Sequence, residues 1–173
     1  MSTLGIRLAT AADADAVAGL SRELLAFYGI QAPSPRWVMA ESIRLNVFAA
    51  ASGNGAQPHA PGIEVLLADR DGIAVGLLAF VQVYSVAVCQ DTFFIQDIFV
   101  SERWRGEGVG RQMMDALARL AAERGVEQID WTADPWNDRA RRFYDRLGPL
   151  QRADKVFYRM AGPNLRSFTR RNR

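Results

Sequence analysis

A β-rich run, a glycine-rich turn, an amphipathic helix and a second β-rich run follow one another between residues 92 and 133. The helix carries its apolar residues on one face, namely Val109, Met113, Leu117 and Leu120. Its length predicts a crossover between two parallel strands of one sheet, because antiparallel neighbours need only a tight turn. The order therefore predicts a βαβ unit.

Short strands and helices alternate along the rest of the chain. We expect strands near 6–8, 63–68, 73–83, 126–133 and 155–160, and helices over 12–28, 37–48 and 137–147. The turn Asp69-Arg-Asp-Gly72 predicts an antiparallel hairpin. The fold class is therefore α/β (mixed α+β), with a mixed, mainly antiparallel central sheet of six to seven strands and four helices. A length of 173 residues suits a single domain, which we place at 1–162.

Composition narrows the function classes. With one cysteine, Cys89, and one histidine, His59, the sequence gives no His/Cys zinc site, and we expect no metal. The sequence lacks an apolar run of membrane-spanning length, and its first residues do not read as a targeting segment. The expectation is a cytoplasmic protein that does not bind membranes.

Positive charge is concentrated at the C-terminus. The net charge is +2, and residues 164–173 hold four arginines and no acid, so the rest of the chain carries −2. We interpret 163–173 as a basic, flexible, solvated tail and do not expect nucleic acid as a partner. Nucleic-acid binding through this tail remains the alternative.

The turn between the first run and the helix has glycines at alternate positions, Gly106, Gly108 and Gly110. Glycines let backbone N–H groups approach a ligand, and a helix N-terminus attracts anions. Three nearby arginines, Arg103, Arg105 and Arg111, add positive charge. The turn therefore predicts a phosphate or pyrophosphate site, although neither the Walker nor the Rossmann spacing is present.

Two motifs in this region resemble those of the Gcn5-related N-acetyltransferase (GNAT) family. Arg105, Gly108 and Gly110 form R-x-x-G-x-G, and the segment 137–148 is close to N-x-x-A-x-x-F-Y-x-x-x-G. The resemblance covers roughly residues 4–160 in element order and is specific over about 92–148. In motif it is closest to the polyamine (spermidine/spermine-type) branch.

The resemblance implies a splayed parallel strand pair that admits the pantetheine arm of acetyl-CoA. It assigns cofactor binding to residues of the strand, the turn and the following helix: Ile98, Phe99, Val100, Arg105, Gly106, Glu107, Gly108, Val109, Gly110, Arg111, Asn137, Ala140 and Tyr144. Arg105 has an alternative role in holding the turn, and Asn137 has one as a helix N-cap. Tyr144 is the candidate catalytic acid, because a phenol stays protonated at neutral pH and can protonate the leaving thiolate.

The base is left open, because Gln96 stands where the polyamine branch has glutamate. Strict strand alternation would place the neighbouring Asp97 on the face opposite Gln96. A water relay ending on Asp130 or Asp134 is one hypothesis, and an acetyl-enzyme on Cys89 is a disfavoured one.

Candidate residues for the acceptor site come from several parts of the chain: Tyr28, Trp37, Tyr84, Gln96 and Asp97. We expect an acetyl-CoA-dependent N-acetyltransferase that acetylates a primary amine of a small molecule by direct attack in a ternary complex. Alternative acceptors are a protein lysine or N-terminus. A non-catalytic acyl-CoA sensor is the alternative from another class, and dimerisation is expected from the family alone.

Overall fold

The computed structural model describes residues 3–48, 62–148, 150–151 and 158–170. The chain forms two compact units, Met1–Asp134 and Pro135–Arg173. The first unit holds the β-sheet, and the described residues of the second form short helices and connecting segments.

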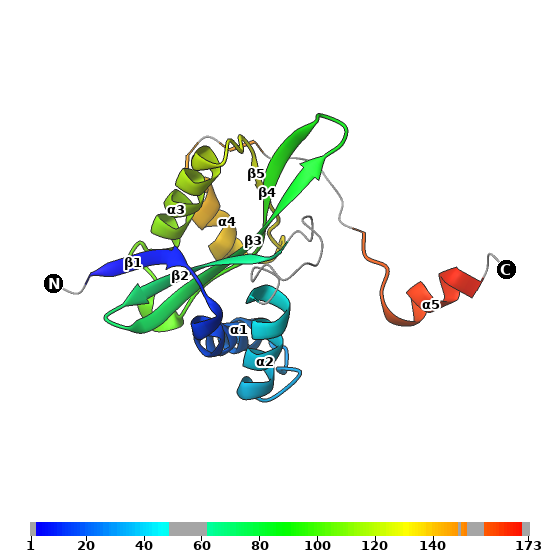
Figure 1. Ribbon diagram of the computed structural model, residues 1–173, viewed down its shortest axis with the longest axis horizontal. Coiled ribbons are helices and arrows are strands. Elements are labelled where there is room, and N and C mark those ends of the chain that lie inside the picture. The colour runs from blue at the N-terminus through cyan, green and yellow to red at the C-terminus, as the bar shows by residue number, and fades with distance from the viewer. Residues whose placement is uncertain (1–2, 49–61, 149, 152–157, 171–173) are drawn as a thin grey trace. The chain divides into compact units, whose positions relative to one another are not determined.

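The sheet has five strands within the described residues, in the order β1-β2-β3-β4-β5 (Figure 1). Their bounds are β1 Leu4–Leu8, β2 Glu64–Arg70, β3 Ile73–Ser85, β4 Gln90–Val100 and β5 Ile129–Trp131. The pairs β1–β2, β2–β3 and β3–β4 are antiparallel, whereas β4 and β5 are parallel. The expected mixed, mainly antiparallel sheet is confirmed.

The strand count is below the expected six to seven. The strand expected over 155–160 falls partly on residues 155–157, which lie outside the described residues, and 158–160 do not form a strand. The β2–β3 turn is as predicted. Asp71 and Gly72 both have positive φ, and the Asp69 carboxylate accepts a hydrogen bond from the Gly72 N–H at 3.0 Å.

The helices of the first unit cover both faces of the sheet (Figure 1). Helices α1 (Ala14–Phe27) and α2 (Arg36–Ile43, extended by a π-helical turn Arg44–Phe48) lie on one face, and α3 (Val109–Glu123) lies on the other. Arg36 of α2 binds the Asp15 carboxylate of α1 through two nitrogens, at 3.0 and 2.6 Å. This bidentate ion pair links α2 to α1, although both side chains are exposed and such pairs contribute little to stability.

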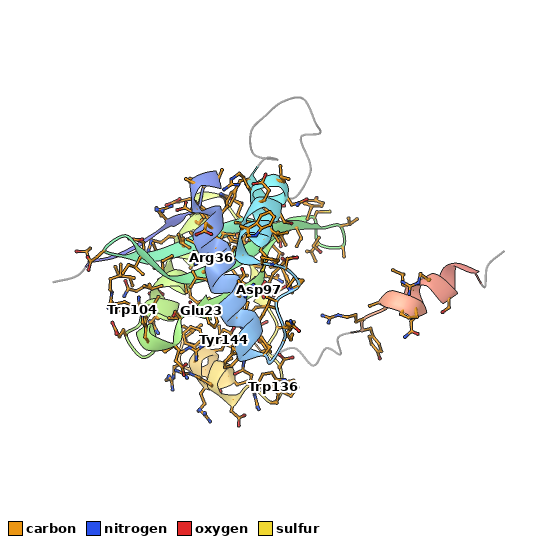
Figure 2. The ribbon with its side chains drawn as sticks, turned by 90° about the horizontal axis from the view of Figure 1, so that it is seen from below. Glu23, Arg36, Asp97, Trp104, Trp136 and Tyr144 are labelled. Carbon is orange, nitrogen blue, oxygen red and sulfur yellow. The ribbon has the colours of Figure 1, made fainter. Side chains whose placement is uncertain are left out.

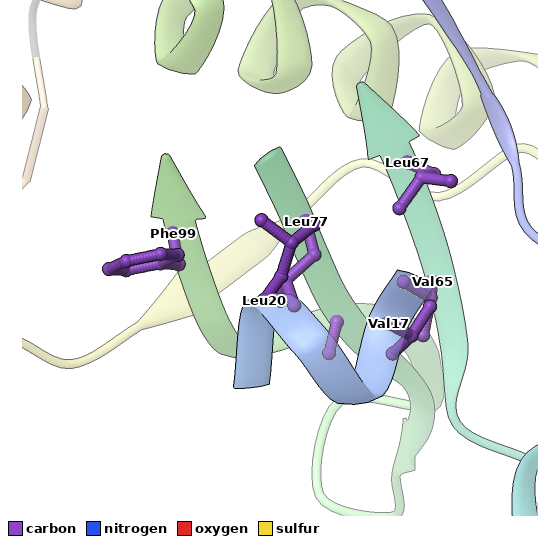
Figure 3. Close-up of a cluster of buried hydrophobic side chains, with 7 residues drawn as sticks. Val17, Leu20, Val65, Leu67, Leu77 and Phe99 are labelled. Carbon is purple, nitrogen blue, oxygen red and sulfur yellow. The ribbon is translucent and has the colours of Figure 1, made fainter. Parts of the chain in front are cut away.

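The core beneath α1 is a continuous apolar cluster (Figure 3). Its buried members come from α1 and from three neighbouring strands: Val17, Leu20, Val65, Leu67, Leu77, Ala79 and Phe99. Phe99 belongs to β4, so the end of this strand is fixed by the same cluster that holds α1.

On the other face, α3 lies close to the backbone of β3. A Cβ atom added at Gly76 would meet the Phe99 carbonyl oxygen at 3.0 Å and the Met113 Cε atom at 3.1 Å. Met113 is completely buried. Gly76 therefore allows α3 to pack directly on the sheet.

The second unit contains α4 (Asp138–Asp145) and α5 (Gly162–Arg170). Helix α4 matches the helix expected over 137–147. Helix α5 occupies most of the segment expected to be a flexible tail. Within the described parts of the chain, no helix combines the length and the apolar character needed to cross a bilayer.

Substitution of Gly76 tests the close packing of α3. Gly76→Val should lower the free energy of unfolding by about 1–3 kcal/mol, because the added atoms must displace backbone or Met113. Chemical denaturation measures the change. Gly5→Val in β1 is the matched control, since the nearest neighbour of an added Cβ atom there is the Asp69 carbonyl oxygen at 4.0 Å. An equal loss for both variants would contradict this explanation.

Candidate functional site

Strand β4 contains one residue more than its partner β3 at the centre of their pairing. Ala79 pairs with Asp97 and the next residue of β3, Phe80, pairs with Ile95, so Gln96 is the extra residue of a β-bulge. A bulge bends the strand and interrupts its ladder, and bulges are common beside active sites. The bulge separates β4 into two segments with different surroundings.

The pairing of β4 with β5 ends at the bulge. The last parallel pair among the described residues is Ile95 with Trp131, whereas β4 continues to Val100. The Ser101 N–H donates to the Val75 carbonyl at 2.9 Å. By the alternation of an antiparallel ladder, the Phe99 backbone then bonds to β3, while the N–H and C=O groups of Ile98 and Val100 face the β5 side. We call the segment 96–100 the open edge of β4.

Asp97 lies on the sheet face covered by α1 (Figure 2). It is opposite Ala79, whose side chain belongs to the core cluster beneath α1, whereas Ile95 is opposite Phe80 and faces the other way. The prediction for Asp97 assumed that side chains alternate strictly between the two faces along β4. The bulge at Gln96 interrupts this alternation. Asp97 is an exposed residue, but the protein around its carboxyl partly desolvates it and raises its pKa.

The glycine-rich turn follows the open edge and leads into α3. It begins with a 3₁₀ turn, Glu102–Trp104, and two glycines then adopt positive φ, 87° at Gly106 and 80° at Gly108. L-residues with side chains rarely adopt this region, which explains glycine at both positions. Gly108 is the N-cap of α3 without a capping side chain, and Val109 and Gly110 open the helix. N–H groups of a first helical turn lack intrahelical acceptors and can bind an anion.

Arg105 holds this turn against the end of β4. Its Nε donates to the Val100 carbonyl oxygen at 2.8 Å. Its guanidinium also lies over the rings of Phe27 and Phe99, at 5.2 and 5.3 Å from their centroids. The contacts support the alternative in which Arg105 holds the turn, and they connect it to the last residue of α1.

Glu107, between the two positive-φ glycines, forms an ion pair with Arg70 at the end of β2. The Arg70 guanidinium also lies 4.8 Å from the centroid of the Trp104 ring. Arg103 lies over the same ring at 5.0 Å. The charge of Glu107 is therefore neutralised by Arg70, which is not part of the glycine-rich motif.

The other candidate cofactor and catalytic residues belong to the second unit. Asn137 is the N-cap of α4, and its side-chain oxygen accepts a hydrogen bond from the Ala140 N–H at 3.1 Å. The N-cap role expected as an alternative is thus confirmed. Tyr144 is half-buried on α4, and its ring lies 5.2 Å from that of Phe143.

The acceptor-site candidates fall in three places. Tyr28 caps the C-terminus of α1, Trp37 is the second residue of α2, and both are exposed. Tyr84 lies near the tip of the β3–β4 hairpin, which projects away from α1 and α2 in Figure 1. Tyr28 and Trp37 thus flank the connection between α1 and α2, Tyr84 lies at the hairpin, and Gln96 and Asp97 lie at the bulge of β4.

Two of the less favoured chemical candidates, Cys89 and Asp130, are exposed. Cys89 lies in the hairpin turn, where its thiol is 3.6 Å from the Val86 carbonyl, and His59 lies outside the described residues. Asp130 accepts a hydrogen bond from Gln128 at 2.8 Å. In the described part of the chain, His, Cys, Asp and Glu side chains do not gather in any group of three or more suited to a metal ion.

A family model described as the acetyltransferase (GNAT) family matches residues 26–148, which is more than half of the chain. The chain belongs to the GNAT acetyltransferase family. The prediction of an N-acetyltransferase domain is confirmed at this level. The match includes the open edge, the turn and α4.

Curated relatives of this GNAT chain include enzymes that acetylate amines of amino acids. It is 29% identical over 114 residues to an L-ornithine N5-acetyltransferase of Arabidopsis thaliana, covering 65% of this chain and 50% of that protein. It is 26% identical over 153 residues to a thialysine N-epsilon-acetyltransferase of Mus musculus, covering 86% and 85%. The chain thus spans about half the length of the ornithine enzyme.

Solved structures confirm the GNAT fold. An integron cassette protein from the mobile metagenome of V. cholerae has a TM-score of 0.80 at 24% identity, covering 96% of this chain and 97% of that one. An aminoglycoside N-acetyltransferase in complex with CoA has a TM-score of 0.68 at 21% identity, covering 92% and 95%. At these identities the likeness establishes the fold alone.

Sequence reasoning missed the bulge and the Arg70–Glu107 ion pair. No glycine or proline marks Gln96 as a bulge, so the only signal was the polar pair Gln96-Asp97 inside an apolar strand. Arg70 and Glu107 are 37 positions apart, and no local pattern connects them.

Asp97→Asn tests the desolvation of this carboxyl. Because the pKa of Asp97 is raised in the folded protein, ionisation of this carboxyl destabilises the fold. The stability is fully present below the unfolded pKa of about 3.9, where the carboxyl is protonated in both states, and it is lost as pH rises through the folded pKa. The amide removes this loss, so the variant should unfold at a higher temperature than the wild type at pH 7 and at nearly the same temperature near pH 3.5. Thermal melts across this pH range measure the difference. A constant decrease at every pH would contradict the assignment.

Proposed function

We propose that this chain is an acetyl-CoA-dependent N-acetyltransferase that acetylates a primary amine of a small molecule. Residues 1–162 act as one catalytic domain, and the acetyl group passes directly from the thioester to the amine in a ternary complex. The observation that carries the proposal is the open edge of β4, which leads straight into the glycine-rich turn and the N-terminus of α3.

In this proposal the pantetheine arm pairs with the open edge. Ile98 directs its N–H and C=O groups to that side, and Val100 directs its N–H, since the Val100 carbonyl oxygen already accepts a hydrogen bond from Arg105. Phe99 contributes a buried side chain to the core. The Ile98 N–H, close to the bulge, donates to the thioester carbonyl. A fixed donor of this kind stabilises the developing oxyanion, and its loss in other enzymes costs about 3–4 kcal/mol.

The pyrophosphate of acetyl-CoA binds at the turn, from Gly106 to Arg111. The positive φ values of Gly106 and Gly108 and the first N–H groups of α3 support this placement. Arg105 and Glu107 hold the turn through contacts with the protein itself. Asn137, Ala140 and Tyr144 remain proposed cofactor contacts from α4.

The chemistry needs a proton acceptor and a proton donor. The neutral amine attacks the thioester carbon, a C–N bond forms, and the C–S bond breaks as the tetrahedral intermediate collapses. Tyr144 donates its phenolic proton to the departing sulfur. Asp97 takes the proton of the attacking amine, directly or through water, and its raised pKa makes it a stronger base than an ordinary aspartate.

The acceptor we propose is a small molecule with an ω-amino group, such as a basic amino acid or a polyamine. Two relatives are named for the N5 amine of ornithine and the Nε amine of thialysine, which are both terminal amines on flexible side chains. Asp97 supports this choice, since a carboxylate attracts an ammonium group. Tyr28 and Trp37 are the proposed aromatic neighbours of the acceptor, and membership of the polyamine-type branch is part of this proposal.

One observation favours a second candidate, a non-catalytic acyl-CoA sensor. Gln96 has replaced the glutamate of the polyamine-type branch and cannot accept a proton. The two candidates differ in turnover, since both bind CoA. Dimerisation and cytoplasmic location stay predictions.

An amine panel distinguishes the transferase from the sensor. Thiol release from acetyl-CoA is followed with ornithine, lysine, thialysine, spermidine, an aminoglycoside and a lysine peptide, beside calorimetry with CoA. We expect CoA binding and turnover with the ω-amines. CoA binding without turnover on any amine would favour the sensor, and no CoA binding would contradict both.

Tyr144→Phe tests the proposed acid. With the best amine it should lower kcat about 10²- to 10³-fold with little change in the KM for acetyl-CoA, because only the protonation of the leaving thiolate is lost. Tyr158→Phe is the matched control, since that side chain is 87% exposed. Unchanged kcat in Tyr144→Phe would remove the tyrosine from the mechanism.

A further inference from the structure

Arg70 is an unusual arginine for the end of a strand. Its side chain is only 17% exposed, and its Nε is buried without a hydrogen-bond partner among the described residues. Burial of an unpaired N–H group is unfavourable, so other contacts must hold the side chain in place. The contacts that the structure gives it are the ion pair with Glu107 and the Trp104 ring.

Both contacts lie in the segment that leads from β4 into α3. Trp104 ends the 3₁₀ turn, and Glu107 lies between Gly106 and Gly108, which have positive φ. Glycines leave a chain highly flexible, so Glu107 is the residue through which a side-chain contact can fix this part of the turn. Arg70 makes that contact from β2, a strand paired on both sides.

Charge gives Arg70 a second effect. Glu107 is a carboxylate beside the proposed pyrophosphate site, and its side chain is 42% exposed. An unpaired carboxylate there would repel the ligand, because like charges a few ångströms apart disfavour each other even in partly solvated sites. The paired Arg70 offsets this repulsion.

We propose that Arg70 is a positioning residue for acetyl-CoA. It holds the Gly106–Gly108 turn in the conformation that binds the pyrophosphate and neutralises Glu107, while the ligand itself contacts backbone N–H groups. The proposal rests on the proposed function, since it assumes that this turn binds CoA. A turn that is already ordered in the free protein loses less conformational entropy when the ligand binds.

A double-mutant cycle on CoA affinity tests this role. Arg70→Ala should raise the calorimetric Kd for CoA about tenfold, because it leaves Glu107 unpaired and loosens the turn. Glu107→Gln should raise Kd about twofold in the wild type but lower it about threefold in the Arg70→Ala background. This change of sign identifies the pair, since independent charges would give Glu107→Gln the same effect in both backgrounds.

Kinetics separate positioning from general damage. Arg70→Ala should raise the KM for acetyl-CoA about tenfold, leave kcat at saturating acetyl-CoA within about twofold, and leave the KM for the amine unchanged. Arg70→Lys keeps the charge and loses the planar group, so an increase of about threefold is expected. It also provides a test if Arg70→Ala fails to fold.

Arg124→Ala is the matched control at the other end of α3. Arg124 pairs with Glu64 at the start of β2 through two nitrogens, at 2.5 and 2.7 Å, and lies over the Phe93 ring. Its loss should lower the melting temperature and leave the Kd for CoA unchanged. Wild-type affinity in both Arg70 variants, or additive effects in the cycle, would overturn this inference alone. A wild-type protein that does not bind CoA would overturn the proposed function with it.

Discussion

Three consecutive residues of β4, Ile95 to Asp97, pair with only two of β3, and the arrangement of the site depends on this mismatch. Before the bulge β4 has partners on both sides, and after it β4 pairs with β3 alone among the described residues. A central strand with one unpaired edge is unfavourable, because backbone N–H and C=O groups need partners. The same edge is therefore where an extended ligand gains most from pairing. The bulge also turns Asp97 toward the α1 face, so one local irregularity places both a backbone edge and a carboxylate.

The proposed anion site at the glycine-rich turn is formed by backbone N–H groups more than by side chains. The sequence suggested that nearby arginines attract the anionic ligand directly. The structure uses Arg105 differently: it bonds to the Val100 carbonyl and lies over Phe27 and Phe99. Arg70, which the motif does not include, pairs with Glu107. The N–H groups of the turn and of the first turn of α3 therefore supply backbone donors for an anion, and Arg105 and Arg70 hold the segment that carries them.

Much of this fold was readable from local sequence. The Asp-Arg-Asp-Gly turn, the apolar face of α3 and the spacing of Arg105, Gly108 and Gly110 each follow from short-range rules of turn and helix chemistry. The bulge at Gln96 could not be predicted from the sequence, because glutamine has no special backbone preference. The position of a bulge also depends on how β4 pairs with β3. The desolvation of Asp97 and the pairing of Arg70 with Glu107 also depend on tertiary contacts between distant segments. Of the last expected strand, residues 158–160 do not form one, and residues 155–157 lie outside the described residues.

Gly76 has a consequence beyond stability. Because α3 packs directly on the strand backbone at Gly76, the distance between this helix and the sheet can vary little. The position of the N-terminus of α3 is restricted in the same way. The open edge exposes main-chain atoms, which almost any residue supplies, and the turn adds only the requirement for glycine at its two positive-φ positions. The connection between α1 and α2, by contrast, presents exposed side chains such as Tyr28 and Trp37. Within the proposed function, substitutions in that connection can therefore alter which amine is accepted while the backbone that binds the cofactor stays unchanged.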